Sequence, residues 1–150
     1  KLPQGHGMGI ANYFTFGGYA AFVVEVKVDK GALEIVRVTG AVDCGIAVNP
    51  LGIKAQMEGG ALDGFSAALG QEVMIEEGRV VSNNLDSYQM ARINQAPKRV
   101  DTYIVESAEA PTGLGEIALP AAIPALCNAI FAASGKRIRR FPIADQLKDI

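Results

Sequence analysis

Apolar and polar residues alternate along two stretches near the start of the chain, and this pattern predicts a β-hairpin. Between Tyr19 and Val28, valines at every second position are separated by Glu25 and Lys27, which is the period of a strand with one buried face. A second β-rich stretch runs from Leu33 to Val42. The link Asp29-Lys30-Gly31 between the two is typical of a hairpin turn. We therefore expect two antiparallel strands here.

The hydrophobic spacing then changes to that of a helix. Asn49 and Pro50 are suited to the cap and the first turn, and apolar residues recur at helical intervals as far as about Leu69. Three glycines interrupt this helix, at positions 59, 60 and 64, and each costs about 1 kcal/mol relative to alanine. Their presence predicts either close packing against another backbone or a ligand, or a weak and frayed helix.

The rest of the chain predicts a second hairpin, a loop, a strand and a final helix. The hairpin covers Gln71 to Val81 with its turn at Glu77-Gly78, and a polar loop follows over 82–98. Val100 to Glu106 alternates like a strand, and an apolar helix runs from about Ile123 to Ser134. Hairpins mixed irregularly with helices indicate the α+β class, with the hairpins forming a mixed sheet and two main helices on one side.

Two further features of the pattern indicate that neighbouring structure is missing. The glycine-rich start, Gly5 to Gly9, predicts a flexible end that resembles a cut edge. The last helix is apolar all round, so it predicts burial on most sides. A piece of 150 residues offers little to surround such a helix, and exposed apolar surface predicts self-association of the isolated chain.

Composition narrows the classes of function. The net charge is −2 and 49% of residues are apolar, which gives no indication of nucleic-acid binding. The basic cluster from Lys136 to Arg140 follows a predicted helix end and is interpreted as a solvated face. No apolar run is long enough to span a membrane. A single histidine, His6, argues against a catalytic triad or a histidine metal site, and Cys44 and Cys127 are interpreted as buried apolar residues.

One carboxylate, Glu116, stands out as candidate chemistry. It lies on a glycine-rich loop just ahead of Pro120 and Pro124, which are suited to the entry of the last helix. A carboxylate held there can act as a general base. The alternative is a favourable partner for the helix dipole, and the residues of the loop alone leave both open.

Four stretches, taken in order and spacing, resemble the C-terminal part of the molybdenum-binding large subunit of the xanthine dehydrogenase/aldehyde oxidase family. The chain looks most similar to the isoquinoline 1-oxidoreductase β-subunit type. The stretches are Ala41 to Pro50, Gln56 to Gly60, Gly113 to Glu116 and Asn128 to Arg137. By this resemblance, residues 1–150 are a C-terminal fragment of the molybdenum cofactor-binding domain.

The resemblance implies roles for individual residues. Glu116 matches the glutamate that serves as the base beside the molybdenum, and Gln56 matches a glutamine that hydrogen-bonds the pterin. Gly59 and Gly60 would let the cofactor approach, and Gly115 would complete the cofactor site by holding Glu116 in place. No metal ligand is expected from the chain itself.

The resemblance also implies cofactor, substrate and partners. The cofactor is molybdenum bound to molybdopterin cytosine dinucleotide, held by the full-length subunit, and the substrate is an N-heteroaromatic compound or an aldehyde that gains an oxygen from water. The partners are the remainder of the large subunit and an iron–sulfur small subunit. The fragment alone is expected to be inactive, and the cytoplasm and the periplasm both remain open.

One departure from the family pattern is the reason for considering an alternative function. Relatives usually carry Pro followed by Gly or Pro after the glutamate, whereas Ile117-Ala118 stand here, which predicts a looser loop. A non-catalytic assembly domain with the family fold is therefore the alternative, and a stand-alone binding module for a small ligand is a third. Asp43, Cys44 and Asn49 match the family too and are assigned to a turn, the core and a cap.

Overall fold

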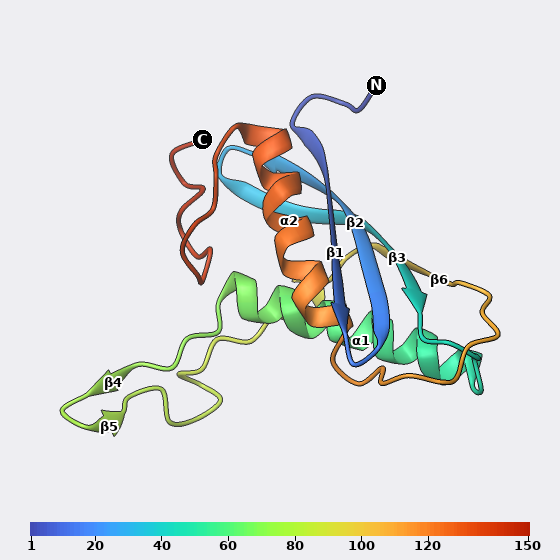
Figure 1. The fold of residues 1–150 in the computed structure, drawn as a ribbon. Helices are drawn as coiled ribbons and strands as arrows, with labels where there is room; N and C mark the ends of the chain where they lie inside the picture. The colour runs from blue at the N-terminus through green and yellow to red at the C-terminus, as the bar shows by residue number, and fades with distance from the viewer.

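The computed structural model describes residues 1–150 and contains one main sheet, two long helices and a projecting arm (Figure 1). The main sheet has the order β1-β2-β3-β6; its first three strands are antiparallel, and β6 runs parallel to β3. This mixed sheet with two helices confirms the α+β prediction. The elements are β1 (His6–Thr15), β2 (Gly18–Asp29), β3 (Ala32–Asp43), α1 (Pro50–Leu69), β4 (Ile75–Glu76), β5 (Arg79–Val80), a short 3-10 helix (Ile93–Gln95), β6 (Arg99–Ile104) and α2 (Ala118–Ser134).

The predicted hairpin is present as β2 and β3, and its buried face forms one side of the hydrophobic core. Phe22, Val24 and Val26 point into this face and are fully buried. Val24 pairs with Val38, while Phe22 lies opposite Gly40 across the ladder. A single core cluster joins this face to both helices, because the alternation in the sequence places every second side chain on one side.

The prediction of a flexible start was wrong, because the residues after Gly5 form the edge strand β1. This strand pairs with β2 along its whole length, from His6 opposite Lys27 to Thr15 opposite Gly18. Glycine in β1 serves packing rather than mobility. A Cβ built at Gly9 would lie 2.2 Å from the backbone nitrogen of Ala129, so the strand and α2 touch backbone to backbone.

Helix α2 begins earlier than predicted. It starts at Ala118, so Pro120 lies in the first turn but Pro124 lies inside the helix, and the prediction that both prolines mark its entry was wrong for Pro124. Its end was predicted correctly, since Gly135 follows with a left-handed φ of 75°. The helix packs on β1, β2 and α1 along one side only, and its outer side, which includes Phe131, is exposed.

Helix α1 follows the prediction closely. The Asn49 side chain accepts a hydrogen bond from the Gly52 nitrogen at 3.1 Å, as an N-cap does. A Cβ at Gly60 would lie 2.8 Å from the Cβ of Ala118 in α2. The glycines at this crossing therefore serve close packing, and the frayed-helix alternative does not apply.

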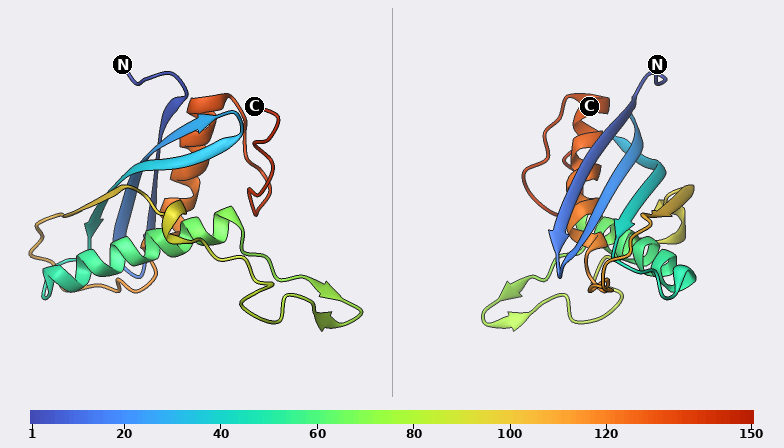
Figure 2. Two further views of the ribbon diagram at one scale, coloured as in Figure 1. Left: turned by 180° about the vertical axis from the view of Figure 1, so that it is seen from behind. Right: turned by 45° about the vertical axis from the view of Figure 1, so that its right-hand side comes forward.

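The second predicted hairpin is present as a short arm that projects from the body (Figure 2). Strands β4 and β5 pair over two residues each, and the turn residues Glu77 and Gly78 both have positive φ, as a type I′ turn requires. The loop that follows returns the chain to β6, which matches the predicted strand within two residues. None of the helices is long and apolar enough to cross a membrane.

Candidate functional site

The five residues singled out by the sequence all line one hollow. It measures about 480 Å³ and lies between the middle of α1 and the loop that leads into α2. The first side is made by α1 and the second by the loop and the first turn of α2. The lining residues are Gln56, Gly59, Gly60, Asp63, Gly115, Glu116, Leu119 and Pro120.

A hydrogen bond joins the two sides of this hollow. The Gln56 amide nitrogen donates to the carbonyl oxygen of Gly115 at 2.6 Å. Gly115 immediately precedes Glu116, so this contact fixes the peptide from which the carboxylate projects. The amide oxygen of Gln56 makes no hydrogen bond within the chain and remains free to accept one from a ligand.

The loop before Glu116 is held to the sheet. The Thr112 nitrogen donates to the Cys44 carbonyl at 2.9 Å, and the Gly113 nitrogen donates to the Phe16 carbonyl at 3.2 Å. Cys44 is itself a core residue, and the preceding Asp43 accepts a hydrogen bond from the Gly45 nitrogen, which confirms the core and turn predictions. These bonds attach the loop to the β1–β2 turn and to the end of β3.

The loop is also fixed after Glu116, which overturns the prediction of a looser segment there. Ile117 is fully buried, and Ala118 is 2% exposed and packs against Gly60. The apolar pair that replaces the usual proline therefore anchors the chain by burial. Glu116 itself is exposed and lines the hollow, on a segment held at both ends.

The two glycines of α1 at the hollow differ in their surroundings. A Cβ at Gly59 would meet no atom within 4 Å, whereas one at Gly60 would press on Ala118. A Cβ at Gly115 would likewise meet no atom within 4 Å. Gly59 and Gly115 therefore leave backbone accessible to a ligand, while Gly60 is occupied by the contact between helices.

We expect alanine substitutions at Gly59 and at Gly60 to have opposite effects on stability. Gly59→Ala should stabilise the cofactor-free protein by about 1 kcal/mol, because alanine favours the helix and meets open space. Gly60→Ala should destabilise it by about 1–3 kcal/mol through overpacking against Ala118. Thermal unfolding measures both. Destabilisation by Gly59→Ala would contradict the assignment of an open backbone at this site.

The hollow carries negative charge and no balancing cation. Its lining includes two exposed carboxylates, Glu116 and Asp63, and no Lys, Arg or His. Asp63 was not predicted from the sequence. The signal that identifies it is its helical spacing, since Gln56, Gly59 and Asp63 lie on one face of α1. Such a lining suits a ligand that donates hydrogen bonds.

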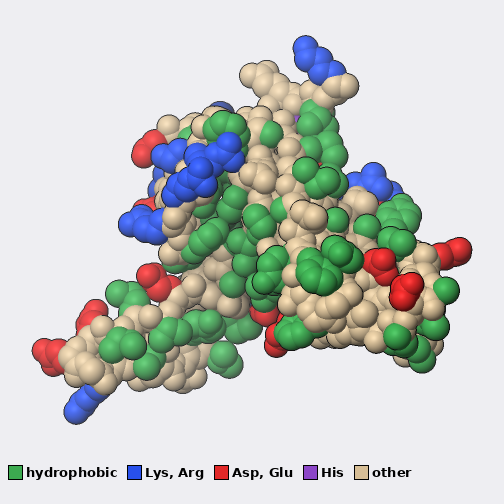
Figure 3. All heavy atoms as spheres, viewed as in Figure 1, with side chains coloured by type: hydrophobic (Ala, Val, Ile, Leu, Met, Phe, Trp, Pro, Cys, Tyr) green, Lys and Arg blue, Asp and Glu red, His purple; other side chains and the backbone are tan.

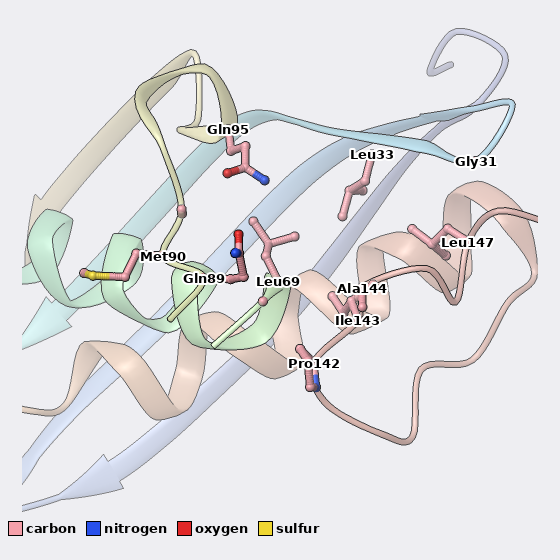
Figure 4. Close-up of a pocket in the computed structure, with 12 residues that line it drawn as sticks. Gly31, Leu33, Leu69, Gln89, Met90, Gln95, Pro142, Ile143, Ala144 and Leu147 are labelled. Carbon is pink, nitrogen blue, oxygen red and sulfur yellow. The ribbon is translucent and has the colours of Figure 1, made fainter. Parts of the chain in front are cut away.

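Another hollow, of about 420 Å³, lies at the C-terminal end of α1 (Figure 4). Leu33, Leu69 and Ile143 line it together with the amides of Gln89 and Gln95. It has no ionisable side chain, so it offers no acid or base. The hollow that contains Glu116 is therefore the stronger candidate for catalysis.

No three His, Cys, Asp or Glu side chains are grouped so that they could hold a metal ion. Both cysteines are unpaired; Cys44 is buried as predicted, whereas Cys127 is only half-buried, so its prediction as a buried residue was wrong. Burial raises the pKa of both thiols. Neither thiol lines the hollow that contains Glu116.

Comparison with known proteins assigns the fold to a family. A family model described as the molybdopterin cofactor-binding domain matches residues 2–97, which include Gln56, Gly59 and Gly60 but not Glu116. The chain is 40% identical to the membrane-bound aldehyde dehydrogenase [pyrroloquinoline-quinone] of Gluconacetobacter polyoxogenes, covering 100% of this chain and 20% of that protein. It is 33% identical to the isoquinoline 1-oxidoreductase β subunit of Brevundimonas diminuta, covering 98% of this chain and 19% of that protein.

Comparison with solved structures supports the same family. The aldehyde oxidoreductase of Desulfovibrio gigas superposes with a TM-score of 0.75 at 27% identity, over 88% of this chain and 15% of that one. The fold is thus that of a cofactor-binding domain of molybdenum oxidoreductases. The chain belongs to the molybdopterin cofactor-binding family, among the molybdenum subunits of the xanthine dehydrogenase/aldehyde oxidase group, as the sequence resemblance predicted. It spans about a fifth of the length of the first curated relatives it matches.

Proposed function

We propose that the protein carrying this chain is a molybdenum hydroxylase that oxidises an N-heteroaromatic compound or an aldehyde with oxygen from water. Residues 1–150 supply the C-terminal part of its cofactor-binding domain. The observation that carries the proposal is the position of Glu116, which projects from a loop tied to Gln56 beside an open hollow.

The residues of the hollow fit a pterin. A pterin ring presents an amino group and ring N–H groups, which need acceptors. The free amide oxygen of Gln56 and the carboxylate of Asp63 are such acceptors, and Gly59 and Gly115 leave room for a flat ring to approach the backbone. Gln56 and Gly115 would thus hold the cofactor as well as the loop.

The negative charge of the hollow limits the chemical groups that it can bind. With two carboxylates and no cation in its lining, it disfavours phosphate groups. If the cofactor is the cytosine dinucleotide form, its phosphates are held by residues outside this hollow.

When bound, the molybdenum cofactor supplies a Lewis acid and accepts the electrons removed from the substrate. The part of Glu116 is to take up the proton released as water-derived oxygen is transferred. Its carboxylate is suited to this because the loop is fixed at both ends, which preserves its distance from a bound ligand. Electrons leave through a separate iron–sulfur subunit.

Metal and pterin analysis of the whole protein tests the proposal, using a host that makes the cofactor. We expect equimolar molybdenum and pterin in the whole protein and neither in the isolated residues 1–150. Pyrroloquinoline quinone should be assayed in the same sample, because one relative is named for it. Quinone in place of molybdenum and pterin would refute the proposal, and absence of all three would favour a non-catalytic domain.

A further inference from the structure

A groove on the outer side of α2 differs in character from the hollow that contains Glu116. It measures about 340 Å³ and lies between the middle of α2 and the segment that follows the helix. Arg137 and Arg139 line it together with Asn128 and Phe141. It has no carboxylate in its lining and shares no residue with the hollow of Glu116.

The cations at this groove lack acidic partners. Lys and Arg side chains gather beside the C-terminal end of α2 (Figure 3). None of the ion pairs of the chain involves Lys136, Arg137, Arg139 or Arg140. Positive charge left without a partner beside a hollow favours an anion.

Arg137 is held in place rather than free in solvent. Its Nη1 donates to the Asn128 side-chain oxygen at 3.2 Å, and its guanidinium carbon lies 3.5 Å from the centroid of the Phe131 ring. Asn128 is fixed in turn, because its amide nitrogen donates to the Ile10 carbonyl in β1 at 3.1 Å. One contact to Asn128 leaves most of the five guanidinium donors of Arg137 for a ligand.

The rest of the lining is apolar. Ile123, Pro124, Cys127 and Ile138 complete the lining, and Phe141 is 48% exposed. An inorganic ion without an organic group would make no contact with this apolar surface. The groove therefore combines a fixed guanidinium with a surface on which a flat ring can stack.

We propose that this groove binds a small organic anion in which a carboxylate or a phosphate is carried by a planar ring. Arg137 and Arg139 bind the anionic group, and Phe141 contacts the ring. The proposal does not rest on the catalytic role of Glu116, because the two sites have no residue in common.

Titration calorimetry on the whole protein tests this with four probes: adenosine monophosphate, benzoate, adenosine and inorganic phosphate. We expect one of the two ring-bearing anions to bind, and adenosine and inorganic phosphate to bind at least about tenfold more weakly. Arg139→Gln should weaken the binding by about tenfold or more, since a charge-assisted hydrogen bond is lost. Phe141→Ala should reduce affinity toward that of inorganic phosphate.

The matched control is Arg79→Gln, which removes the same charge from β5 in the arm and should leave binding unchanged. Preference for adenosine monophosphate identifies phosphate as the anionic group, and preference for benzoate identifies carboxylate. No binding at millimolar concentration, or equal binding by the Arg139→Gln variant, overturns the proposal. Binding of inorganic phosphate as tightly as the ring-bearing anions overturns it as well.

Discussion

Replacing Glu116 with glutamine in the whole protein is expected to lower kcat by about 10²–10⁴-fold, the usual contribution of a general base. Glutamine keeps the shape of the side chain but cannot take up a proton. Because Gln56 holds the backbone of Gly115 and Ile117 is buried, the loop should keep its conformation in this variant. Steady-state turnover at saturating substrate measures the effect, with molybdenum content determined on the same sample.

The matched control for this experiment is Glu109→Gln. Glu109 is exposed on the same connecting segment but does not line the hollow, so the loss of its charge should leave kcat within twofold or so. Unchanged turnover in the Glu116→Gln variant would refute the catalytic assignment. The family fold would then serve assembly, which is the alternative that the Ile117-Ala118 departure first raised.

Gly9→Ala is expected to have the largest effect on stability. The added Cβ would lie 2.2 Å from the Ala129 nitrogen and 2.3 Å from the Ala125 carbonyl oxygen. Backbone cannot give way as a flexible side chain can, so α2 must move off β1, at a cost of about 3 kcal/mol or more. Hydrogen exchange of the α2 amides reports this directly, because weaker docking of the helix raises their opening rate.

Met8→Ala serves as the comparison for Gly9→Ala. Met8 is the neighbour of Gly9 in β1, but its side chain points to the open face of the sheet and is 48% exposed. Its truncation should change stability by about 0.5 kcal/mol or less. Equal protection of α2 in the Gly9→Ala variant and the unchanged protein would show that the helix does not need this close approach.

Local patterns predicted those parts of the fold that depend on neighbouring residues. Alternating valines gave the β2–β3 hairpin, Asn49-Pro50 gave the start of α1, and Gly135 gave the end of α2. Each of these depends on a side-chain period or a backbone conformation within a few residues. The turn at Glu77-Gly78 belongs to the same group.

The errors arose where distant contacts decide the structure. Gly7 and Gly9 look like flexible chain in the sequence, and only the presence of α2, more than a hundred residues later, shows that they are needed for contact. Pro124 looks like a helix start because a proline inside a helix is costly, yet the packing of α2 on β1, β2 and α1 extends the helix past it.

The candidate site, too, has parts that the sequence predicted and parts that depend on distant contacts. Glu116 was singled out by its glycine-rich loop, and the resemblance then gave it the role of a base. Gln56 was selected through the resemblance alone, and the hydrogen bond between its side chain and Gly115 could not be inferred from their spacing. Asp63 was missed because a lone acidic residue on a helix is ordinarily a solvent-facing group. Its place beside Glu116 depends on how α1 crosses the start of α2.

The attachments of the Glu116 loop have a consequence for the order of folding. Its contacts reach the β1–β2 turn through Phe16, the end of β3 through Cys44 and the middle of α1 through Gln56, so they join residues far apart in the chain. Contacts of such long sequence separation form late, after the local hairpins and helices. We therefore expect the hollow that contains Glu116 to form only when the domain is nearly complete. A partly folded chain, with its hairpins already made, would not yet bring Glu116, Gln56 and Gly115 together.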